Sequence, residues 1–102
     1  MPKAICADKP GGIEVLDWRE IETPDLGPDD ALIHQTKIGL NFIDVYMTSG
    51  TYPFPENGPQ IPGGEAAGVI AELGKNVSHL KIGDRVAYTT PNGAYREERV
   101  LP

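Results

Sequence analysis

Four side chains that can form hydrogen bonds to a reacting molecule lie close together in the middle of this sequence. They are an amide, a carboxylate and two phenols, at Asn41, Asp44, Tyr46 and Tyr52. Amides and phenols are uncharged donors at neutral pH, and fixed donors stabilise an oxygen that gains negative charge in a transition state. The same residues also suit a structural role, with Asn41 capping a helix, Asp44 interacting with the helix dipole and the tyrosines packing. The residue types alone leave both roles open.

The sequence predicts no metal site. Cys6, His34 and His79 lie in separate segments, and no two of them have the spacing of zinc ligands. We interpret His34 as a half-buried residue that faces a neighbouring strand, and Cys6 as a small buried hydrophobe. Glu97 and Glu98 are adjacent in an expected strand, so their side chains point to opposite faces and cannot act as an acid and base pair.

The glycine-rich segment from Gly63 to Gly68 does not match a phosphate-binding loop. Its glycines lack the spacing of the dinucleotide fingerprint, and the residues that follow favour a strand rather than a helix. The stretch from Gly68 to Asn76 departs from the P-loop pattern, because Asn76 stands where Ser or Thr must reach magnesium. We therefore expect no phosphate-binding motif within this chain.

A short helix is predicted to carry most of the polar cluster. Asn41 is a favourable N-cap, Asp44 puts an acid in the first turn, and Gly50 follows the helical pattern of residues 42–48 as a stop. The segment 51–62 contains four prolines and is predicted to be an irregular loop. The helix and this loop would present the four side chains from one region.

The rest of the chain reads as short strands. The 12 glycines and 10 prolines are spread between runs of β-branched and aromatic residues, which is typical of a small barrel or sandwich. A length of 102 residues corresponds to one domain. The expected strands cover residues 3–7, 14–21, 31–40, 66–73, 85–90 and 94–101.

The composition limits which binding partners and which cellular compartment we expect for this protein. The net charge of −6 would repel a nucleic acid backbone. The single cysteine allows no intrachain disulfide, which favours the cytoplasm. The apolar runs are too short for a signal peptide or a membrane span. We expect a cytoplasmic protein that binds neither nucleic acid nor membrane.

Several motifs occur in an order that resembles a known family. They are Gly39 to Pro53, Ile61 to Ile70, Gly74 to Val77, Gly83 to Val86 and Gly93 to Tyr95. Together they resemble the N-terminal catalytic domain of the zeta-crystallin type NADPH:quinone oxidoreductases, in the medium-chain dehydrogenase/reductase superfamily. The resemblance implies that residues 1–102 form a mainly β, GroES-like, partly open barrel with one or two short helices.

The resemblance also implies parts that this chain lacks. Members continue into a Rossmann domain that binds most of the NADPH, and the end of their chain returns to complete the catalytic domain. We therefore expect this chain to be an inactive catalytic-domain fragment of an enzyme, whose full-length form is expected to be a homodimer. The acceptor would be a quinone or a similar electron-poor molecule.

Site residues carry over from the family position by position. Asn41, Tyr46 and Tyr52 match positions that line the cleft, so they are the expected catalytic residues. Asn41 and Tyr46, with Asp44 behind them, are the expected contacts to the cofactor. Many relatives have arginine at the position of Thr48, so any contact made by that cation would be missing here.

The zinc-dependent relatives differ at two positions. They have a cysteine where this sequence has Asn41 and a histidine where it has Gly64, so the resemblance implies a site without metal. Losing the Lewis acid restricts hydride transfer to acceptors that are already electron-poor.

Two other functions stay open. One is a metal-free enone or acyl reductase of the same superfamily, which the neutral donors would serve equally well. The other is a non-catalytic GroES-like binding module, such as a co-chaperonin-like ring subunit. That role needs a long flexible loop, and the proline-rich loop 51–62 is stiff.

Overall fold

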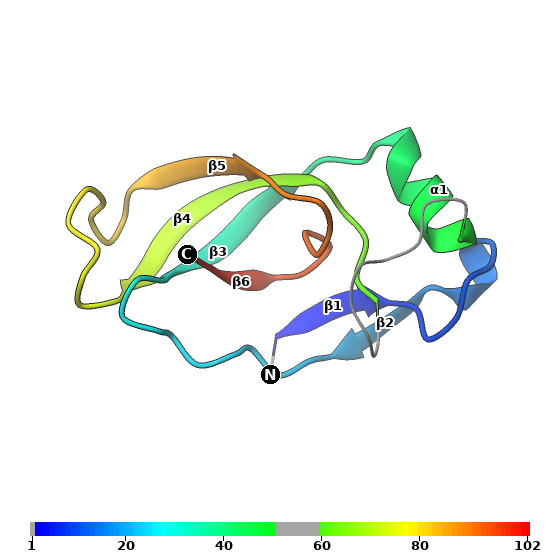
Figure 1. Cartoon of the computed structure of the whole chain (residues 1–102), viewed down its shortest axis with the longest axis horizontal. Coiled ribbons are helices and arrows are strands. Elements are labelled where there is room, and N and C mark those ends of the chain that lie inside the picture. Colours follow the sequence, from blue (N-terminus) through cyan, green and yellow to red (C-terminus); the bar gives the residue numbers. More distant parts are fainter. Residues whose placement is uncertain (1, 51–59) are drawn as a thin grey trace.

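The structure is a computed structural model that describes residues 2–50 and 60–102. Within these residues, two antiparallel sheets and one α-helix form an elongated structure with a longest dimension of 41 Å. Figure 1 shows the helix at one end, beside the small sheet, and the loop that precedes β5 at the other end. No helix in the described part of the chain has the length and apolar character needed to cross a membrane.

The small sheet pairs β1 (Lys3–Cys6) with β2 (Asp17–Glu20). The predicted strand over 14–21 begins too early, because a 3-10 turn, η1 (Ile13–Val15), occupies its first residues. In η1 the backbone N–H groups form hydrogen bonds within the turn, for example from Leu16 N–H to the Ile13 carbonyl at 3.1 Å. These residues therefore do not pair with β1. The expected pairing of the first two strands is nevertheless confirmed.

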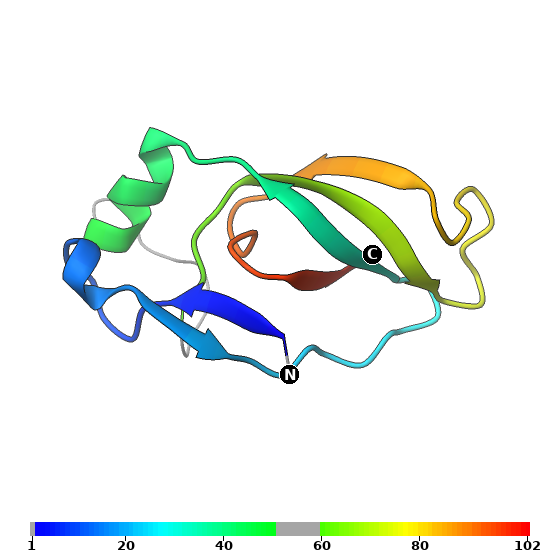
Figure 2. The same ribbon diagram turned by 180° about the vertical axis from the view of Figure 1, so that it is seen from behind.

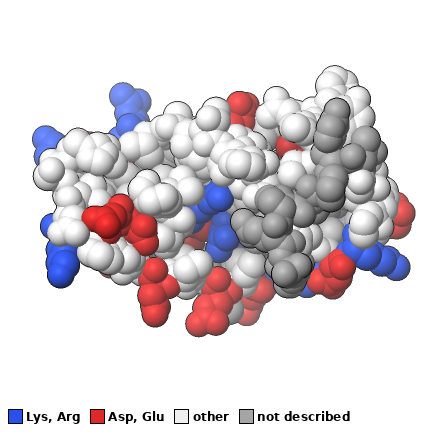
Figure 3. All heavy atoms as spheres, in the orientation of Figure 1, with Lys and Arg blue, Asp and Glu red and all other residues white. Residues whose placement is uncertain are grey.

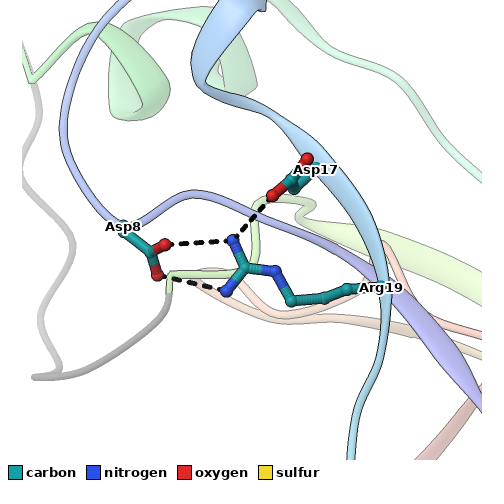
Figure 4. A network of polar contacts seen from close by, with 3 residues as sticks. All are labelled: Asp8, Asp17 and Arg19. Atoms are coloured by element: carbon teal, nitrogen blue, oxygen red, sulfur yellow. Dashed lines mark hydrogen bonds and ion pairs between the residues drawn. The ribbon is translucent and has the colours of Figure 1, made fainter.

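An arginine clamps the outer side of this small sheet. Arg19 in β2 donates two hydrogen bonds to the Asp8 carboxylate, at 3.2 and 3.1 Å, and a third to Asp17 at 3.2 Å (Figure 4). The hydrogen bonds from Arg19 hold the pKa of Asp8 below its usual range. The interaction ties the chain that leaves β1 to the strand that returns beside it.

The large sheet has the order β5-β4-β3-β6, with all neighbours antiparallel. It consists of β3 (Ala31–Ile38), β4 (Glu65–Leu73), β5 (Arg85–Thr89) and β6 (Glu98–Leu101). Six strands are thus present among the described residues, as the sequence predicted. The two sheets do not close into a ring, which confirms a mainly β, partly open barrel (Figures 1 and 2).

The core lies on one face of the large sheet. Ala31 and Ile33 of β3 and Ile70 of β4 are buried there, so the residues of β3 that alternate toward one side are the ones removed from water. Gly68 faces a bulge in β3, and a Cβ at this position would lie 2.3 Å from the His34 carbonyl oxygen. Only glycine allows the two strands to approach this closely.

The segment before β6 joins the two sheets. The sequence predicted a strand over 94–101, but β6 begins only at Glu98, because the preceding residues cross to β1. Ile5 N–H donates to the Tyr95 carbonyl at 2.9 Å, and Glu97 N–H donates to the Lys3 carbonyl at 2.9 Å. One continuous segment therefore holds both sheets together.

The surface reflects the acidic composition. Figure 3 shows acidic side chains along the lower edge of this face, in keeping with the net charge of −6. His34 faces Glu98 on the neighbouring strand, with its Nε2 3.1 Å from a Glu98 carboxylate oxygen, in keeping with its expected position. Its side chain is exposed rather than half-buried. Cys6 is fully buried, as predicted, and burial raises its pKa.

Candidate functional site

The helix α1 (Phe42–Ser49) begins and ends where the local sequence signals predict. Asn41 has extended backbone angles, and its N–H donates to Oδ2 of Asp44 at 3.0 Å. At the other end Gly50 takes a left-handed conformation with φ of 89°, and its N–H donates to the Met47 carbonyl at 3.2 Å. Both ends of the helix are thus fixed by residues within a few positions of them.

The inner face of α1 is unusually polar. Asp44, Met47 and Thr48 are its buried residues, and their spacing places them on one side of the helix. The Thr48 hydroxyl donates to the Asp44 carbonyl at 2.8 Å. The outer face is apolar, with several large residues exposed to solvent. These are Phe42, Ile43, Val45 and Tyr46.

Tyr95 lies against this inner face and was not predicted as a site residue. Its hydroxyl donates to Oδ2 of Asp44 at 2.6 Å. Burial, the hydrogen bond to Asp44 and the charge of that carboxylate raise the pKa of Tyr95 above its ordinary range, so the phenol keeps its proton at any physiological pH. From the sequence Asp44 was assigned to the helix dipole, and no local pattern indicated a partner 51 positions away.

Three chain segments meet at the end of the large sheet that leads into α1. Gly39, directly after β3, donates its N–H to the Glu65 carbonyl at 3.1 Å, and Gly64 accepts from Thr90 N–H at 2.9 Å. The start of β4 and the residue after β5 therefore lie beside the segment that connects β3 to Asn41. An open cavity of about 690 Å³ borders this region, and Gly39, Glu65 and Thr89 contribute to its wall.

The predicted site residues occupy different faces. Asn41 and Asp44 are joined by a hydrogen bond, so the structure brings these two together. Tyr46 lies on the outer face of α1 with 46% of its surface exposed. Thr48 is turned inward. Tyr52 lies outside the described residues.

The residues at this site offer hydrogen-bond donors rather than metal ligands. In the described part of the chain, no group of three His, Cys, Asp or Glu side chains is placed to hold a metal ion. At the position of Gly64 a side chain would meet only the Thr90 carbonyl, at 3.4 Å. The position therefore has room for a ligand, but glycine supplies none.

The start of α1 is poorly suited to a phosphate group. Helix N-termini bind phosphate through free N–H groups, and two of these groups are occupied here, because Asn41 N–H is bonded to Asp44 and Asp44 N–H to the Asn41 carbonyl at 3.1 Å. The Asp44 carboxylate would also repel a phosphate. An uncharged carboxamide could still meet the exposed side chains of Asn41 and Tyr46.

A family model decides the fold assignment. The model described as the alcohol dehydrogenase GroES-like domain matches residues 27–100. The chain belongs to this family. The GroES-like domain that the motifs implied is thereby confirmed, as is its place in the medium-chain dehydrogenase/reductase superfamily.

Similar proteins are named as quinone oxidoreductases. The chain is 45% identical over 102 residues to a quinone oxidoreductase of Pseudomonas aeruginosa, covering 99% of this chain and 31% of that protein. The solved quinone oxidoreductase of Pseudomonas syringae superposes with a TM-score of 0.91 at 47% identity, covering 100% of this chain and 31% of that one. The Escherichia coli enzyme, solved with NADPH, gives a TM-score of 0.88 at 38% identity over 97% of this chain and 30% of that one. The GroES-like chain thus spans about a third of the length of these relatives.

Proposed function

We propose that the protein carrying this GroES-like chain transfers hydride from NADPH to a quinone or a similarly electron-poor acceptor, without a metal. The observation that carries the proposal is the donor at Asn41, an uncharged amide at the start of α1, two residues after Gly39, whose N–H donates to the Glu65 carbonyl. The similarity to quinone oxidoreductases supports the acceptor class. The cofactor is supported by the NADPH complex of the Escherichia coli relative.

The residues of this chain would bind and orient the acceptor. The Asn41 amide and the Tyr46 hydroxyl can donate hydrogen bonds to an acceptor oxygen as it gains negative charge. Tyr52 is proposed to add a third donor. NADPH, when bound, supplies the hydride. Asn41 is the N-cap of α1 and Tyr46 lies within this helix, so the proposed contribution of the chain is positioning together with stabilisation of the developing charge.

The absence of metal in the proposal rests on ligand chemistry. Asn41 and Gly64 stand where the zinc-dependent relatives have a cysteine and a histidine, and neither an amide nor a glycine is a ligand that zinc prefers. A quinone needs no Lewis acid, because its carbonyls already accept electrons readily. The proposal extends to a cytoplasmic homodimer, on the family resemblance and the single cysteine.

The test uses the full-length natural protein and three acceptors. Loss of NADPH absorbance is followed with 1,4-benzoquinone, with methyl vinyl ketone and with acetaldehyde, before and after dialysis against a chelator. We expect the quinone to be reduced fastest, the aldehyde not to react and the chelator to have no effect. A faster reaction with the enone would favour the enone reductase alternative. Aldehyde reduction that depends on stoichiometric zinc, measured by elemental analysis, would refute the proposal.

A second measurement concerns the 102-residue chain by itself. The start of α1 has no glycine-rich segment to hold the pyrophosphate, so we expect only weak binding of NADPH in titration calorimetry. A micromolar dissociation constant would contradict this expectation. It would place the main cofactor contacts within the GroES-like domain.

A further inference from the structure

Two arginines point toward the buried sides of the two sheets. Arg99 of β6 is paired with Ile33 of β3, and Arg96 lies opposite Ala4 of β1 in an isolated antiparallel bridge. Side chains of directly opposed residues share one face of a sheet, and Ile33 and Ala4 are 4% and 0% exposed. Both arginine side chains are therefore directed to the inside of the partly open barrel, where each residue stays partly accessible to solvent.

The two guanidinium groups lie close to each other. The Nη1 atom of Arg99 lies 3.5 Å from the Tyr88 hydroxyl, and its Cζ lies 5.5 Å from the centre of the Tyr88 ring. The Nε atom of Arg96 donates at 2.8 Å to the Glu98 carbonyl, which belongs to the peptide group that leads into Arg99. Burial and the charge of Arg99 lower the pKa of Arg96, as expected for two like charges that are near each other.

The fold holds this pair of cations in place through neutral groups. A Cβ at Gly93 would lie 2.8 Å from Nη2 of Arg99, so glycine leaves the space that the guanidinium group occupies. The Tyr88 hydroxyl beside Arg99 donates to the amide oxygen of Gln35. The amide nitrogen of Gln35 in turn donates to the Arg96 carbonyl at 2.6 Å. A chain of hydrogen bonds thus connects the two arginines, but none of its members carries a negative charge.

Neither arginine has an anionic partner among the described residues. In that part of the chain, the basic side chains within 4.0 Å of a carboxylate oxygen are those of Arg19 and His34. The Glu98 carboxylate accepts from the Thr23 hydroxyl at 2.8 Å. It lies on the other side of β6 from Arg99, because neighbours in a strand point to opposite faces. A charge that is partly removed from water is costly unless an opposite charge accompanies it.

The unpartnered nitrogen atoms of the two arginines can be reached from solvent. Within the described residues, Arg96 has no hydrogen-bond partner at either terminal nitrogen, and Arg99 has none at Nε. The one side-chain nitrogen or oxygen there that is both buried and unpartnered is Oδ1 of Asp44. The unpartnered arginine nitrogens therefore have accessible surface. Figure 3 shows basic side chains at the surface in the middle of the view, near the position of β6 in Figure 1.

We infer that Arg96 and Arg99 form a binding site for a small carboxylate, which accepts hydrogen bonds from the accessible nitrogen atoms of both guanidinium groups. A guanidinium group presents parallel N–H donors that match the two oxygens of a carboxylate. The anion would also relieve the repulsion between the two cations. The hydroxyls near Arg99, those of Tyr88 and Thr90 at 3.5 and 3.4 Å, orient its guanidinium group without neutralising it.

The first experiment compares acetate with acetamide on the unaltered protein in its full natural length. The two probes have the same shape, but only acetate is charged. NMR follows the arginine Nε–H signals and the backbone amides of residues 94–99, with the ionic strength held constant by chloride. Acetate should shift these signals saturably, with a dissociation constant on the order of 1 mM, because so small a ligand binds weakly. No saturable shift with acetate, or equal shifts with acetamide, would overturn the inference.

Variants of the two arginines test the location of the site. Arg99→Gln removes one cation but keeps a side chain that can donate, and it should weaken acetate binding by about tenfold or more. Arg96→Gln should have a similar effect, so the test remains decisive if one variant does not fold. The matched control is Arg85→Gln, which removes an exposed arginine at the start of β5 and should keep the full affinity. Unchanged affinity in Arg96→Gln and Arg99→Gln would show that acetate binds elsewhere.

A third variant separates net charge from geometry. Arg99→Lys keeps the positive charge but loses the parallel donors. Its affinity for acetate should lie between that of the unaltered protein and that of Arg99→Gln. Full affinity in Arg99→Lys would show that net charge alone attracts the anion, and it would overturn the proposed contact. Binding of acetate needs neither NADPH nor a quinone, so this inference is independent of the proposed function.

Discussion

Tyr95 donates a hydrogen bond of 2.6 Å to Asp44, a residue 51 positions away in the sequence. Asp44 in turn accepts from the N–H of Asn41, so a single carboxylate oxygen connects the chain before β6 to the N-cap of the helix. The position of Asn41 at the candidate site therefore depends on a contact with a distant part of the chain.

We predict that Tyr95→Phe lowers both stability and activity. Removing the phenol from an ionised partner should cost about 2 kcal/mol of unfolding free energy, measured by urea denaturation. The control is Tyr88→Phe, which removes the hydroxyl that donates to Gln35 within the large sheet. That variant should cost about 1 kcal/mol and leave the rate of quinone reduction unchanged. Equal losses of activity in both variants would show that Tyr95 acts only through stability.

A second prediction concerns the donors at the start of α1. In the full-length protein, Asn41→Ala should lower kcat by more than about tenfold, since a preorganised donor to developing charge contributes several kcal/mol. Tyr46→Phe and Tyr52→Phe should each lower it by about tenfold or less, because water can replace a phenol in an open cleft. Asn76→Ala is the control, because the Asn76 side chain bonds to Asp29 far from the helix. Full activity of Asn41→Ala with a lowered Tm would make Asn41 a cap only.

A third prediction concerns pH and the clamp on the small sheet. The pKa of Asp8 is lowered by its hydrogen bonds to Arg19, so the folded state favours the ionised form. The stabilisation is therefore complete above the ordinary aspartate pKa of about 3.9 and is lost as the pH falls through the lowered value. Asp8→Asn should be less stable than the unaltered protein at neutral pH, and the gap should close in acid.

The measurement for this clamp is urea denaturation at a series of pH values. The carboxylate is exposed, so we expect a small effect. Asp25→Asn changes an exposed acid in the loop between β2 and β3, and its stability should follow that of the unaltered protein. A gap between Asp8→Asn and the unaltered protein that does not change with pH would argue against the clamp.

A fourth prediction compares two glycines to distinguish the cost of backbone strain from the cost of steric contact with an added Cβ. Gly63 and Gly83 have φ of 110° and 94°, a region that alanine adopts at a cost of about 1 kcal/mol. A Cβ at Gly63 would lie 2.9 Å from both the Tyr95 backbone nitrogen and the Ala94 Cβ, whereas at Gly83 nothing lies within 4 Å. Gly63→Ala should therefore lower the thermal midpoint clearly more than Gly83→Ala. Similar decreases of the thermal midpoint in the two variants would mean that the residues around Gly63 move at little cost to accommodate the added Cβ.

The helix shows what the sequence can predict. Its bounds follow from Asn41, Asp44 and Gly50, whose effects act within one turn, so local signals are sufficient. The contact with Tyr95 could not be predicted in this way, because it depends on how β6 and β1 are brought together. The start of β2 was misplaced for a related reason: Gly12 N–H bonds to the Glu14 side chain at 3.1 Å, which favours a turn that hydrophobic alternation does not reveal.

The link between the two sheets has a consequence for how the chain folds. β1 finds its second partner only in the segment around Glu97, whose side chain accepts from Lys3 N–H across a sequence separation of 94 residues. Contacts this distant slow folding, because a long loop must close before they form. At ordinary rates of synthesis β1 leaves the ribosome roughly ten seconds before that segment. During this interval the edge of β1 that later pairs with residues 95–97 has no partner, so a nascent chain offers chaperones an unpaired strand edge that the finished domain hides.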